Sequence, residues 1–206
     1  MSAHTAFPLV SGHLSLDLVN TEAVRRGVRH DLLLSEEDLE HWIRTMRESG
    51  SLADESCGAR CIVPDSLHTL RDVRAFLRAG FEQTADGKQV DQGWVAHLEK
   101  LIERAPFSYK VQSDTLVPIP VGQPSDALAS LVAMDALRLL VSGELRTLHR
   151  CGNPDCVLLF MDASGRRKWC SMKICGNRIK VARHLAAMGQ SATCDNDSTV
   201  RRKMGN

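Results

Sequence analysis

Apolar residues recur at helical spacing in four stretches of the chain, and this spacing predicts amphipathic helices. The first begins at Ser35 and ends at Gly50, the second begins at Asp65, the third passes through Trp94 and ends before Pro106, and the fourth begins at Ser125 and extends toward Leu148. Gly143 leaves undecided whether the last third of this segment is helical, because glycine weakens a helix interior.

Strict alternation marks a different element near the N-terminus. Leu14, Leu16 and Leu18 alternate with other residues over 13–20, which is the period of a strand with one buried face. We therefore expect a half-buried strand that ends at Asn20.

Two further strands are expected in the middle of the chain, at 107–111 and 116–121, on either side of a turn at Ser113-Asp114. Pro118 and Pro120 lack the N–H that a strand ladder needs, so the second of these strands is expected at a sheet edge. Together the helices and strands predict an α+β fold class.

The composition is that of an ordinary globular protein. Of the 206 residues, 43% are hydrophobic and 25% are charged, which supplies a core and argues against wholesale disorder. No run of about eighteen apolar residues occurs, so no transmembrane helix is expected. Residues 1–11 lack the pattern of a secretory signal. We therefore expect a cytoplasmic protein without a membrane segment.

The charge is distributed unevenly along the chain. The net charge is only +1, but residues 1–145 carry 14 basic and 21 acidic side chains, whereas residues 146–206 carry 12 and 4. An acidic front followed by a basic part suggests two modules with different partners.

Four of the seven cysteines lie in one stretch of 25 residues inside the basic part of the chain, and this clustering indicates a metal site. Cys151 and Cys156 form one C-x4-C pair, and Cys170 and Cys175 form a second. In a cytosolic chain, clustered thiols indicate metal ligands or redox groups rather than disulfides. Four thiolates suit the tetrahedral coordination of zinc and leave no open position. We expect one structural Zn²⁺ per chain.

The residues between the two pairs predict a module similar to a treble clef. Gly152–Asp155 has strong turn residues. Val157–Met161 is apolar, and residues 166–169 are expected to return beside it as the second strand of a hairpin. The second cysteine pair then opens a helix near Ser171.

These residues resemble a known family. Cys170-Ser-Met with Cys175-Gly-Asn-Arg178, the earlier cysteine pair, and the stretch from Phe160 to Trp169 look like the CGNR zinc finger. In that family the finger follows an ABATE domain, and Leu16-Asp-Leu-Val-Asn-Thr21 is similar to the opening of that domain. Gly165 departs from the family, which more often has a polar residue there, and should only loosen a turn.

The resemblance implies a division of the chain and a function. An ABATE-like domain is expected over 1–145 and the CGNR zinc finger over 146–190. Residues 191–206 are polar and weakly patterned, and this pattern predicts a flexible tail. Members of the family are inferred to be stress-induced transcriptional regulators. A front domain that senses a small molecule and a finger that binds DNA are therefore expected.

A helix over about 172–188 would separate apolar from basic side chains. Ile174, Val181, Leu185 and Met188 fall on one arc and are expected to pack on the hairpin, because successive helical residues turn by about 100°. Six cations are expected to contact DNA phosphates: Arg166, Arg167, Lys168, Lys173, Lys180 and Arg183. The alternative is a solvated basic face, docked on the acidic front domain.

Two residues of the finger are assigned structural roles. Arg178 lies at the margin of the apolar arc, so we expect it to donate hydrogen bonds to zinc thiolates or backbone carbonyls. Trp169 is favoured as a core residue over a stacking residue, because it adjoins a ligand cysteine.

Asp17, Asn20 and Thr21 cluster near the N-terminus and are candidates to bind a small effector. The alternative, slightly favoured by the residues alone, is that they cap turns or bond backbone groups. Cys57 and Cys61 have no second pair nearby in sequence. Two incidental thiols are favoured over a second metal site, and a redox pair stays open.

The leading function is a regulator that binds DNA through the finger. A zinc-stabilised protein-interaction module is the alternative. An enzyme using a cleft around Asp17 and Asn20 ranks lowest, because no phosphate loop, nucleophile elbow or catalytic set is evident. A homodimer is expected only because many such regulators read paired half-sites.

Overall fold

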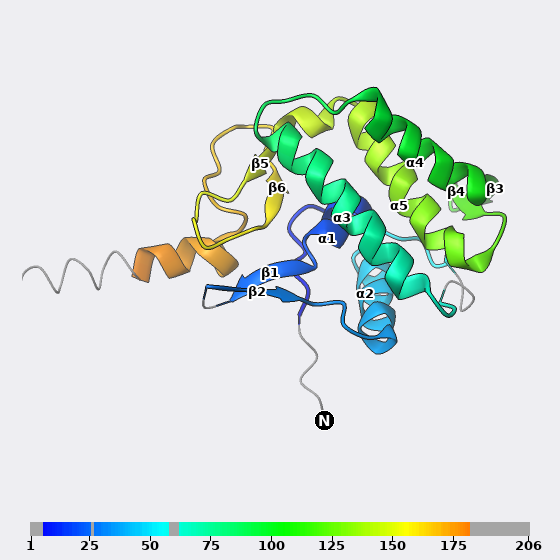
Figure 1. Cartoon of the computed structure of the whole chain (residues 1–206), viewed down its shortest axis with the longest axis horizontal. Coiled ribbons are helices and arrows are strands. Elements are labelled where there is room, and N and C mark those ends of the chain that lie inside the picture. The colour runs from blue at the N-terminus through cyan, green and yellow to red at the C-terminus, as the bar shows by residue number, and fades with distance from the viewer. Residues whose placement is uncertain (1–5, 26, 58–61, 182–206) are drawn as a thin grey trace, which may run out of the picture.

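A short helix lies at the centre of the molecule, enclosed by longer helices, in the computed structural model (Figure 1). The structure describes residues 6–25, 27–57 and 62–181. The central helix is α1 (Leu14–Val19), and the others are α2 (Glu36–Glu48), α3 (Ser66–Ala85), α4 (Gln92–Arg104) and α5 (Pro124–Val141). None of the described helices is both long and apolar enough to cross a membrane.

The strands of the described residues form three antiparallel hairpins. β1 (Glu22–Arg25) pairs with β2 (Val28–Asp31), β3 (Phe107–Gln112) with β4 (Thr115–Pro120), and β5 (Leu148–Arg150) with β6 (Leu159–Met161). A 3-10 helix, η2 (Glu144–Thr147), leads into β5, and a π-helical turn, η3 (Met172–Gly176), follows β6. The β5–β6 end and the β3–β4 end lie on opposite sides of the molecule (Figure 1). The mixture of helices with small sheets confirms the α+β class.

Local capping residues start two of the predicted helices. The Ser35 hydroxyl accepts from the Asp38 N–H at 3.2 Å, and the Asp38 carboxylate accepts from the Ser35 N–H at 3.0 Å, so α2 opens with a capping box. The Asp91 carboxylate accepts from the Trp94 N–H at 2.8 Å and opens α4. These helix starts are set by nearest neighbours in sequence.

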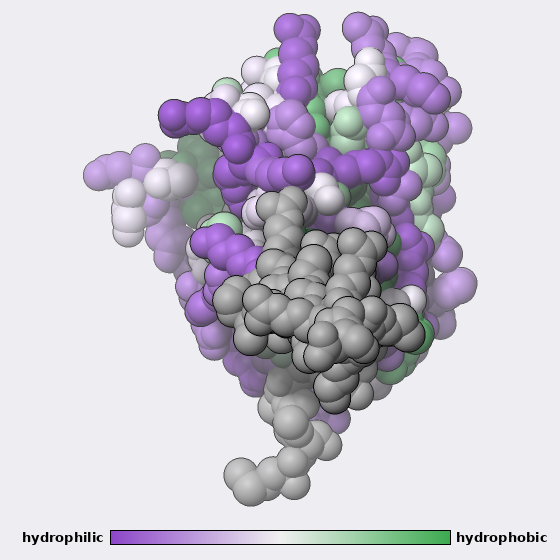
Figure 2. All heavy atoms as spheres, turned by 90° about the vertical axis from the view of Figure 1, so that its left-hand side faces the viewer, coloured by the Kyte–Doolittle hydropathy of each residue, from purple (hydrophilic) through white to green (hydrophobic). Residues whose placement is uncertain are grey.

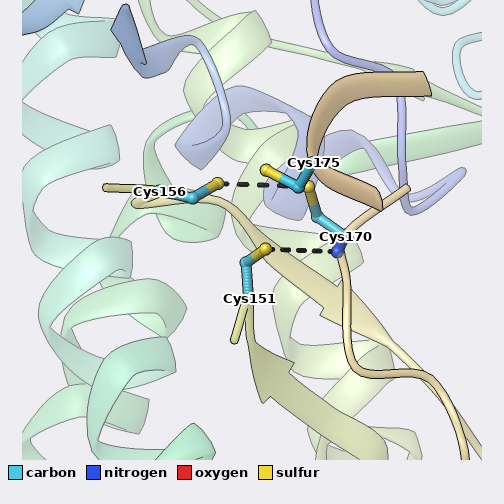
Figure 3. A group of neighbouring side chains, drawn as sticks. All are labelled: Cys151, Cys156, Cys170 and Cys175. Carbon is cyan, nitrogen blue, oxygen red and sulfur yellow. Dashed lines mark hydrogen bonds between the residues drawn. The ribbon is translucent and has the colours of Figure 1, made fainter. Parts of the chain in front are cut away.

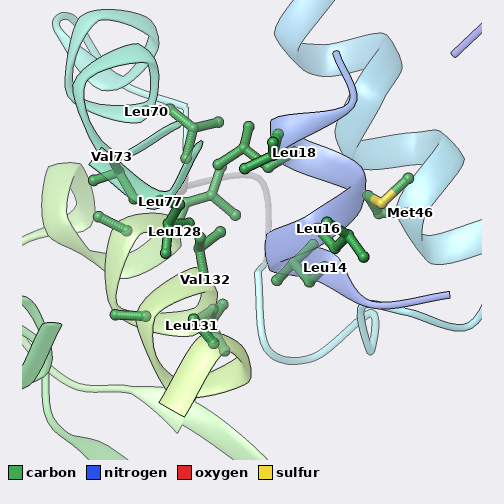
Figure 4. Packing of buried hydrophobic residues seen from close by; sticks show 14 of the residues in the cluster. Leu14, Leu16, Leu18, Met46, Leu70, Val73, Leu77, Leu128, Leu131 and Val132 are labelled. Carbon is green, nitrogen blue, oxygen red and sulfur yellow. The ribbon is translucent and has the colours of Figure 1, made fainter. Parts of the chain in front are cut away.

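The predicted strand at 13–20 is wrong, because Leu14–Val19 forms α1. Leu14, Leu16 and Leu18 are buried, but so are Ser15 and Asp17 between them. The helix is enclosed on every side, and Figure 4 shows its leucines between α3 and α5 on one side and α2 on the other. The alternation of leucine with Ser15 and Asp17 predicted that these two residues face solvent, but both are buried.

The fourth helix begins and ends earlier than predicted. Gln123, not Ser125, occupies the N-cap position, and Pro124 is the first helical residue. The helix ends at Val141 and does not reach Leu148, because Gly143 adopts φ of +79°, a left-handed conformation that a helix cannot include.

The β3–β4 hairpin confirms the two strands predicted around Ser113-Asp114. Both turn residues have positive φ, 44° and 65°, which is the conformation of a two-residue turn matched to strand twist. Pro118 and Pro120 stand opposite Tyr109 and Phe107. In a sheet of only two strands each strand is an edge strand, which confirms the edge position predicted from Pro118 and Pro120.

The predicted hairpin of the finger pairs the wrong strands. β6 pairs with β5, which precedes the first cysteine, and residues 166–169 form no strand. Residues 162–167 instead fold around the Asp162 carboxylate, which accepts from the N–H groups of Ser164 at 3.0 Å and Arg167 at 2.6 Å. The first cysteine pair therefore lies inside the hairpin loop rather than ahead of the hairpin. The expected tail at 191–206 lies outside the described residues.

Helices α3 and α4 approach closely where glycine meets tryptophan. A Cβ placed on Gly80 would lie 2.1 Å from Nε1 of Trp94, and Trp94 is itself buried. Gly80 thus permits the indole to pack against the backbone of α3. Trp94 also contacts Phe81, with ring centroids 6.0 Å apart.

We predict that Gly80→Ala destabilises the protein despite alanine's higher helix propensity. Overpacking against a buried indole costs about 1–3 kcal/mol, and the helical preference returns about 1 kcal/mol, so a net loss of up to about 2 kcal/mol is expected. Urea unfolding measures it. Gly93→Ala is the control, because Gly93 lies exposed in α4 and gains propensity with only Asp91 nearby. Equal stability changes in the two variants would contradict the packing argument.

Candidate metal centre

Two structural elements bring the four cysteines together. Cys151 follows β5 and Cys156 precedes β6, so the first pair lies in the hairpin loop. That loop turns tightly, since the Cys156 N–H donates to the Asn153 carbonyl at 2.9 Å. Cys170 precedes η3, and Cys175 lies within it. The Ser171 hydroxyl caps this turn by accepting from the Ile174 N–H at 3.0 Å, as the sequence predicts.

The sulfur atoms converge on one point (Figure 3). All four lie within 4.8 Å of one another, and the pair Cys156–Cys170 is 4.0 Å apart. A tetrahedral zinc site with Zn–S of about 2.3 Å requires S–S separations of about 3.8 Å. The spacing of the sulfurs is therefore close to that required by one tetrahedral ion.

Hydrogen bonds from neighbouring groups support the sulfurs. The Cys170 N–H donates to Cys151 Sγ at 3.4 Å, and Asn153 Nδ2 donates to Cys175 Sγ at 3.5 Å. The hydrogen bond with Cys151 raises the pKa of Cys156 and that of Cys170, because each thiol would lose this bond on ionising, and repulsion by the Cys151 thiolate adds to the rise. A divalent cation removes this penalty and holds all four as thiolates.

Gly152 allows the two cysteine segments to approach each other. Its N–H donates to the Lys168 carbonyl at 2.9 Å, and a Cβ at this position would lie 2.9 Å from that oxygen. Any side chain here would push apart the segments that carry Cys151 and Cys170. Gly152, which belongs to the turn predicted at 152–155, therefore also allows this close packing.

Arg167 is exposed on the finger, and its guanidinium also makes contacts within the finger. Its guanidinium donates to the Met161 carbonyl at 3.1 Å and to the Cys170 carbonyl, and lies 4.7 Å from the centre of the Phe160 ring. These contacts tie β6 to the second cysteine pair. Arg178 was expected to donate to a zinc thiolate or a backbone carbonyl, but its side chain makes no hydrogen bond or ion pair within the described residues. Asn153 instead donates a hydrogen bond to a ligand sulfur, that of Cys175.

The other predicted phosphate contacts are exposed on the finger. Within the described residues, these side chains have no acidic partner: Arg166, Lys168, Lys173 and Lys180. Arg183 lies outside the described residues. Trp169 is half-buried and packs on the cysteine cluster, with Lys168 Nζ 5.5 Å from its ring centre. The tryptophan therefore has a buried side and an accessible side.

The predicted effector residues of the front domain bond to the protein itself. The Asp17 carboxylate accepts from the N–H groups of Val10, Ser11 and Gly12 at 3.1–3.3 Å. Burial raises the pKa of Asp17, and these hydrogen bonds oppose that rise. The Thr21 hydroxyl donates to the Leu18 carbonyl at 2.7 Å. Such contacts match the structural alternative, and effector binding by this cluster stays a prediction.

Asn20 joins the front domain to the finger. Its Nδ2 donates to the Leu159 carbonyl at 2.9 Å, and its Oδ1 accepts from the Leu159 N–H at 3.0 Å, so the side chain pairs with β6 as a strand would. Asn20 and Leu159 are both buried. The amide thus satisfies two backbone groups that would otherwise lie unpaired in the interior.

Two arginines that sequence reasoning missed extend this junction. Arg78 of α3 donates to the Val19 carbonyl and to the Val157 carbonyl, and its Nε lies 2.6 Å from a Glu22 oxygen. Arg150 of β5 pairs with Asp86 at 2.6 Å. The sequence signal that could have revealed Arg78 was its position beside Leu77 and Phe81 on the buried face of α3, where a charged side chain needs a partner.

Of the three remaining cysteines, the structure describes only Cys57, which is not part of the metal centre. Cys57 is buried and disulfide-bonded, so it is not a free thiol. Cys61 and Cys194 lie outside the described residues. No metal-ligating role is assigned to these three.

Two family models match the chain and together span most of it. Residues 12–143 match ABATE, described as "Putative stress-induced transcription regulator", and residues 147–187 match the CGNR zinc finger. A comparison with curated proteins finds no significant match. The chain belongs to the ABATE family, with a CGNR zinc finger after the ABATE domain. Neither family is described as an enzyme, and the cysteine cluster is the zinc site of the finger, which holds one structural ion.

We predict that Cys175→Ala loses zinc and unfolds the segment from Cys151 to Val181. Three remaining ligands leave an open position, and in small zinc modules metal binding supplies the folding free energy. Zinc content falls below one per chain in a chelator assay, and proteolysis cuts the segment. Lys173→Ala, on the same helical turn, is the control and keeps its zinc. One tightly held zinc in Cys175→Ala would rule out this ligand set.

We predict that Asn20→Ala destabilises the protein by about 2–4 kcal/mol, because it leaves the Leu159 N–H and C=O buried without partners. Urea unfolding gives the loss, and zinc content stays at one per chain because no ligand is changed. Gln92→Ala, which removes an exposed amide of α4, should change stability little. A loss below about 0.5 kcal/mol in Asn20→Ala would show that the amide does not hold the junction.

Proposed function

We propose that this protein is a transcriptional regulator that binds DNA through the basic surface of its zinc finger, and whose front domain responds to a small molecule. Membership of a regulator family supports the first part. The observation that carries DNA binding is the set of finger cations defined above, which are exposed and lack acidic partners among the described residues.

The docking contacts of the finger favour this proposal over a basic face packed on the acidic front domain. The finger contacts the front domain through Val157, Leu159 and Arg150. Lys168 and Lys180 take no part in those contacts and stay exposed. Cations left in water are suited to replace counterions along a phosphate backbone.

A surface hollow next to these cations offers a contact for a flat ring. It has a volume of about 450 Å³ and is lined by Arg166, Lys168, Trp169 and Met172, among others. An accessible indole edge beside cations is typical of sites that touch both a base or sugar and its phosphates. Figure 2 shows this end of the molecule, where hydrophilic side chains make up much of the visible surface of the described residues.

We predict that the triple variant Arg166→Gln, Lys168→Gln and Lys180→Gln binds DNA more weakly and with less salt dependence. Each phosphate contact removed lowers the slope of log affinity against log salt by about 1, so a fall of about 3 is expected. Titration of a labelled DNA duplex between about 50 and 200 mM salt measures it. Zinc content stays at one per chain.

The matched control changes the same charge elsewhere. Lys100→Gln, Arg104→Gln and Lys110→Gln remove three exposed cations of α4 and β3, and should leave the slope unchanged. Arg167 is kept in both variants because it supports the finger. If the parent protein binds no DNA at the lowest salt, the interaction-module alternative replaces this proposal. If both triple variants lose affinity equally, net charge rather than the finger surface drives binding.

A further inference from the structure

A cavity of about 770 Å³ lies at the junction between the front domain and the finger. Its lining comes from the N-terminal segment 6–10, from β1 at Ala23 and Val24, and from the finger at Leu158 and around η3. This volume falls within the range of about 300–1,000 Å³ that is typical of small-molecule sites. The cavity is separate from the cluster of Asp17, Asn20 and Thr21, none of which lines it.

Most of the cavity surface is apolar. Phe7 and Leu9 line it from the N-terminal segment, and Leu158 and Ile174 line it from the finger. Leu9 stays 40% exposed, which leaves apolar surface facing open space. An apolar molecule placed there would remove this surface from water.

The charged side chains of the lining are all positive. Lys173 and Arg178 line the cavity, and no aspartate or glutamate does. Both cations are exposed, and neither has an ionic partner within the described ranges. A bound anionic group would therefore meet two cations and no repelling carboxylate at the solvent side of the cavity.

The zinc thiolates sit deeper than these cations. Cys175 is only 1% exposed, and Cys156 is half-buried, although both reach the lining. Four thiolates around Zn²⁺ carry a net charge of −2, which disfavours an anion at the floor of the cavity. The anionic group of a ligand therefore belongs at the rim, with its apolar part inside.

We infer that this cavity binds a small amphipathic anion, an apolar body that ends in a single carboxylate. The inference rests on the sensing part of the proposed function and places the effector between the two domains. Because both the front domain and the finger line the cavity, occupancy changes the contacts at their junction.

Lys173 belongs both to the cavity rim and to the set of proposed phosphate contacts. A carboxylate held by Lys173 competes with a DNA phosphate for the same ammonium group. The ligand should therefore weaken DNA binding, and DNA should weaken ligand binding by the same factor, because coupling between sites is reciprocal.

Calorimetric titration of the zinc-loaded full chain with decanoate, without DNA, tests the site. Decanoate is expected to bind, whereas decanol and decylammonium, which keep the apolar body and change the head group, should bind at least several-fold more weakly. Equal binding of decanol would overturn the anion requirement. No binding of any of the three would overturn the site.

Two variants locate the binding. Lys173→Gln with Arg178→Gln should raise the Kd for decanoate roughly tenfold, since each exposed ion pair contributes a factor of about 1.4–5. Leu9→Gln should weaken decanoate and decanol alike, and because Leu9 lies outside the buried core clusters the fold is expected to persist. Lys100→Gln with Lys110→Gln is the charge-matched control. A control that weakens binding as much as the rim variant would overturn the assignment.

DNA affinity and decanoate affinity are measured separately, so that the proposed DNA binding and the proposed cavity ligand can be rejected independently of each other. DNA affinity without ligand tests the proposed function, and decanoate affinity without DNA tests the cavity. With both present, saturating decanoate should lower DNA affinity several-fold in the parent and have no such effect in Lys173→Gln. Unchanged DNA affinity in the parent would show that the ligand and DNA do not share Lys173.

Discussion

Helix α1 is buried along its whole length, and the rest of the structure follows from the need to satisfy its polar groups in the interior. A helix of six residues leaves most of its backbone N–H and C=O groups without partners inside the helix. Asp17 folds the preceding loop onto itself through three N–H groups. Arg78 takes up the Val19 carbonyl at the other end. The polar groups at the two ends of α1 are thus tied to the preceding loop and to α3.

The same requirement joins the finger to the front domain. Asn20 pairs with the backbone of Leu159, and Arg78 reaches Val157 as well as Val19. Because these bonds are buried, breaking them would leave unpaired groups in the interior. The finger is therefore held on the front domain by buried contacts of its hairpin. Its η3 side lines the cavity at the junction, and the finger cations stay exposed.

Zinc replaces a hydrophobic core in the finger. The buried cluster there consists of Leu158 and Phe160 with three of the cysteines, which is far too little apolar surface to fold a module of this size. The metal centre therefore supplies the folding free energy that packing does not. Arg167 and the turn at Asp162 then position the segment between the two cysteine pairs.

The sequence by itself determined what depends on near neighbours and on residue chemistry. Four cysteines at two equal spacings define a zinc site wherever they fold, and Ser35 and Asp91 start helices through bonds within one turn. The turn at Ser113-Asp114 is likewise local. Only the tertiary structure decided that Leu14–Val19 is a helix. Alternating leucines predict a strand with one buried face, whereas here every residue of the segment is buried. It alone decided that β6 pairs with β5, since strand pairing depends on which backbone groups are brought together. It also gave Asn20 and Arg78 their partners, which lie 139 and 79 residues away in the chain, beyond the reach of any local pattern.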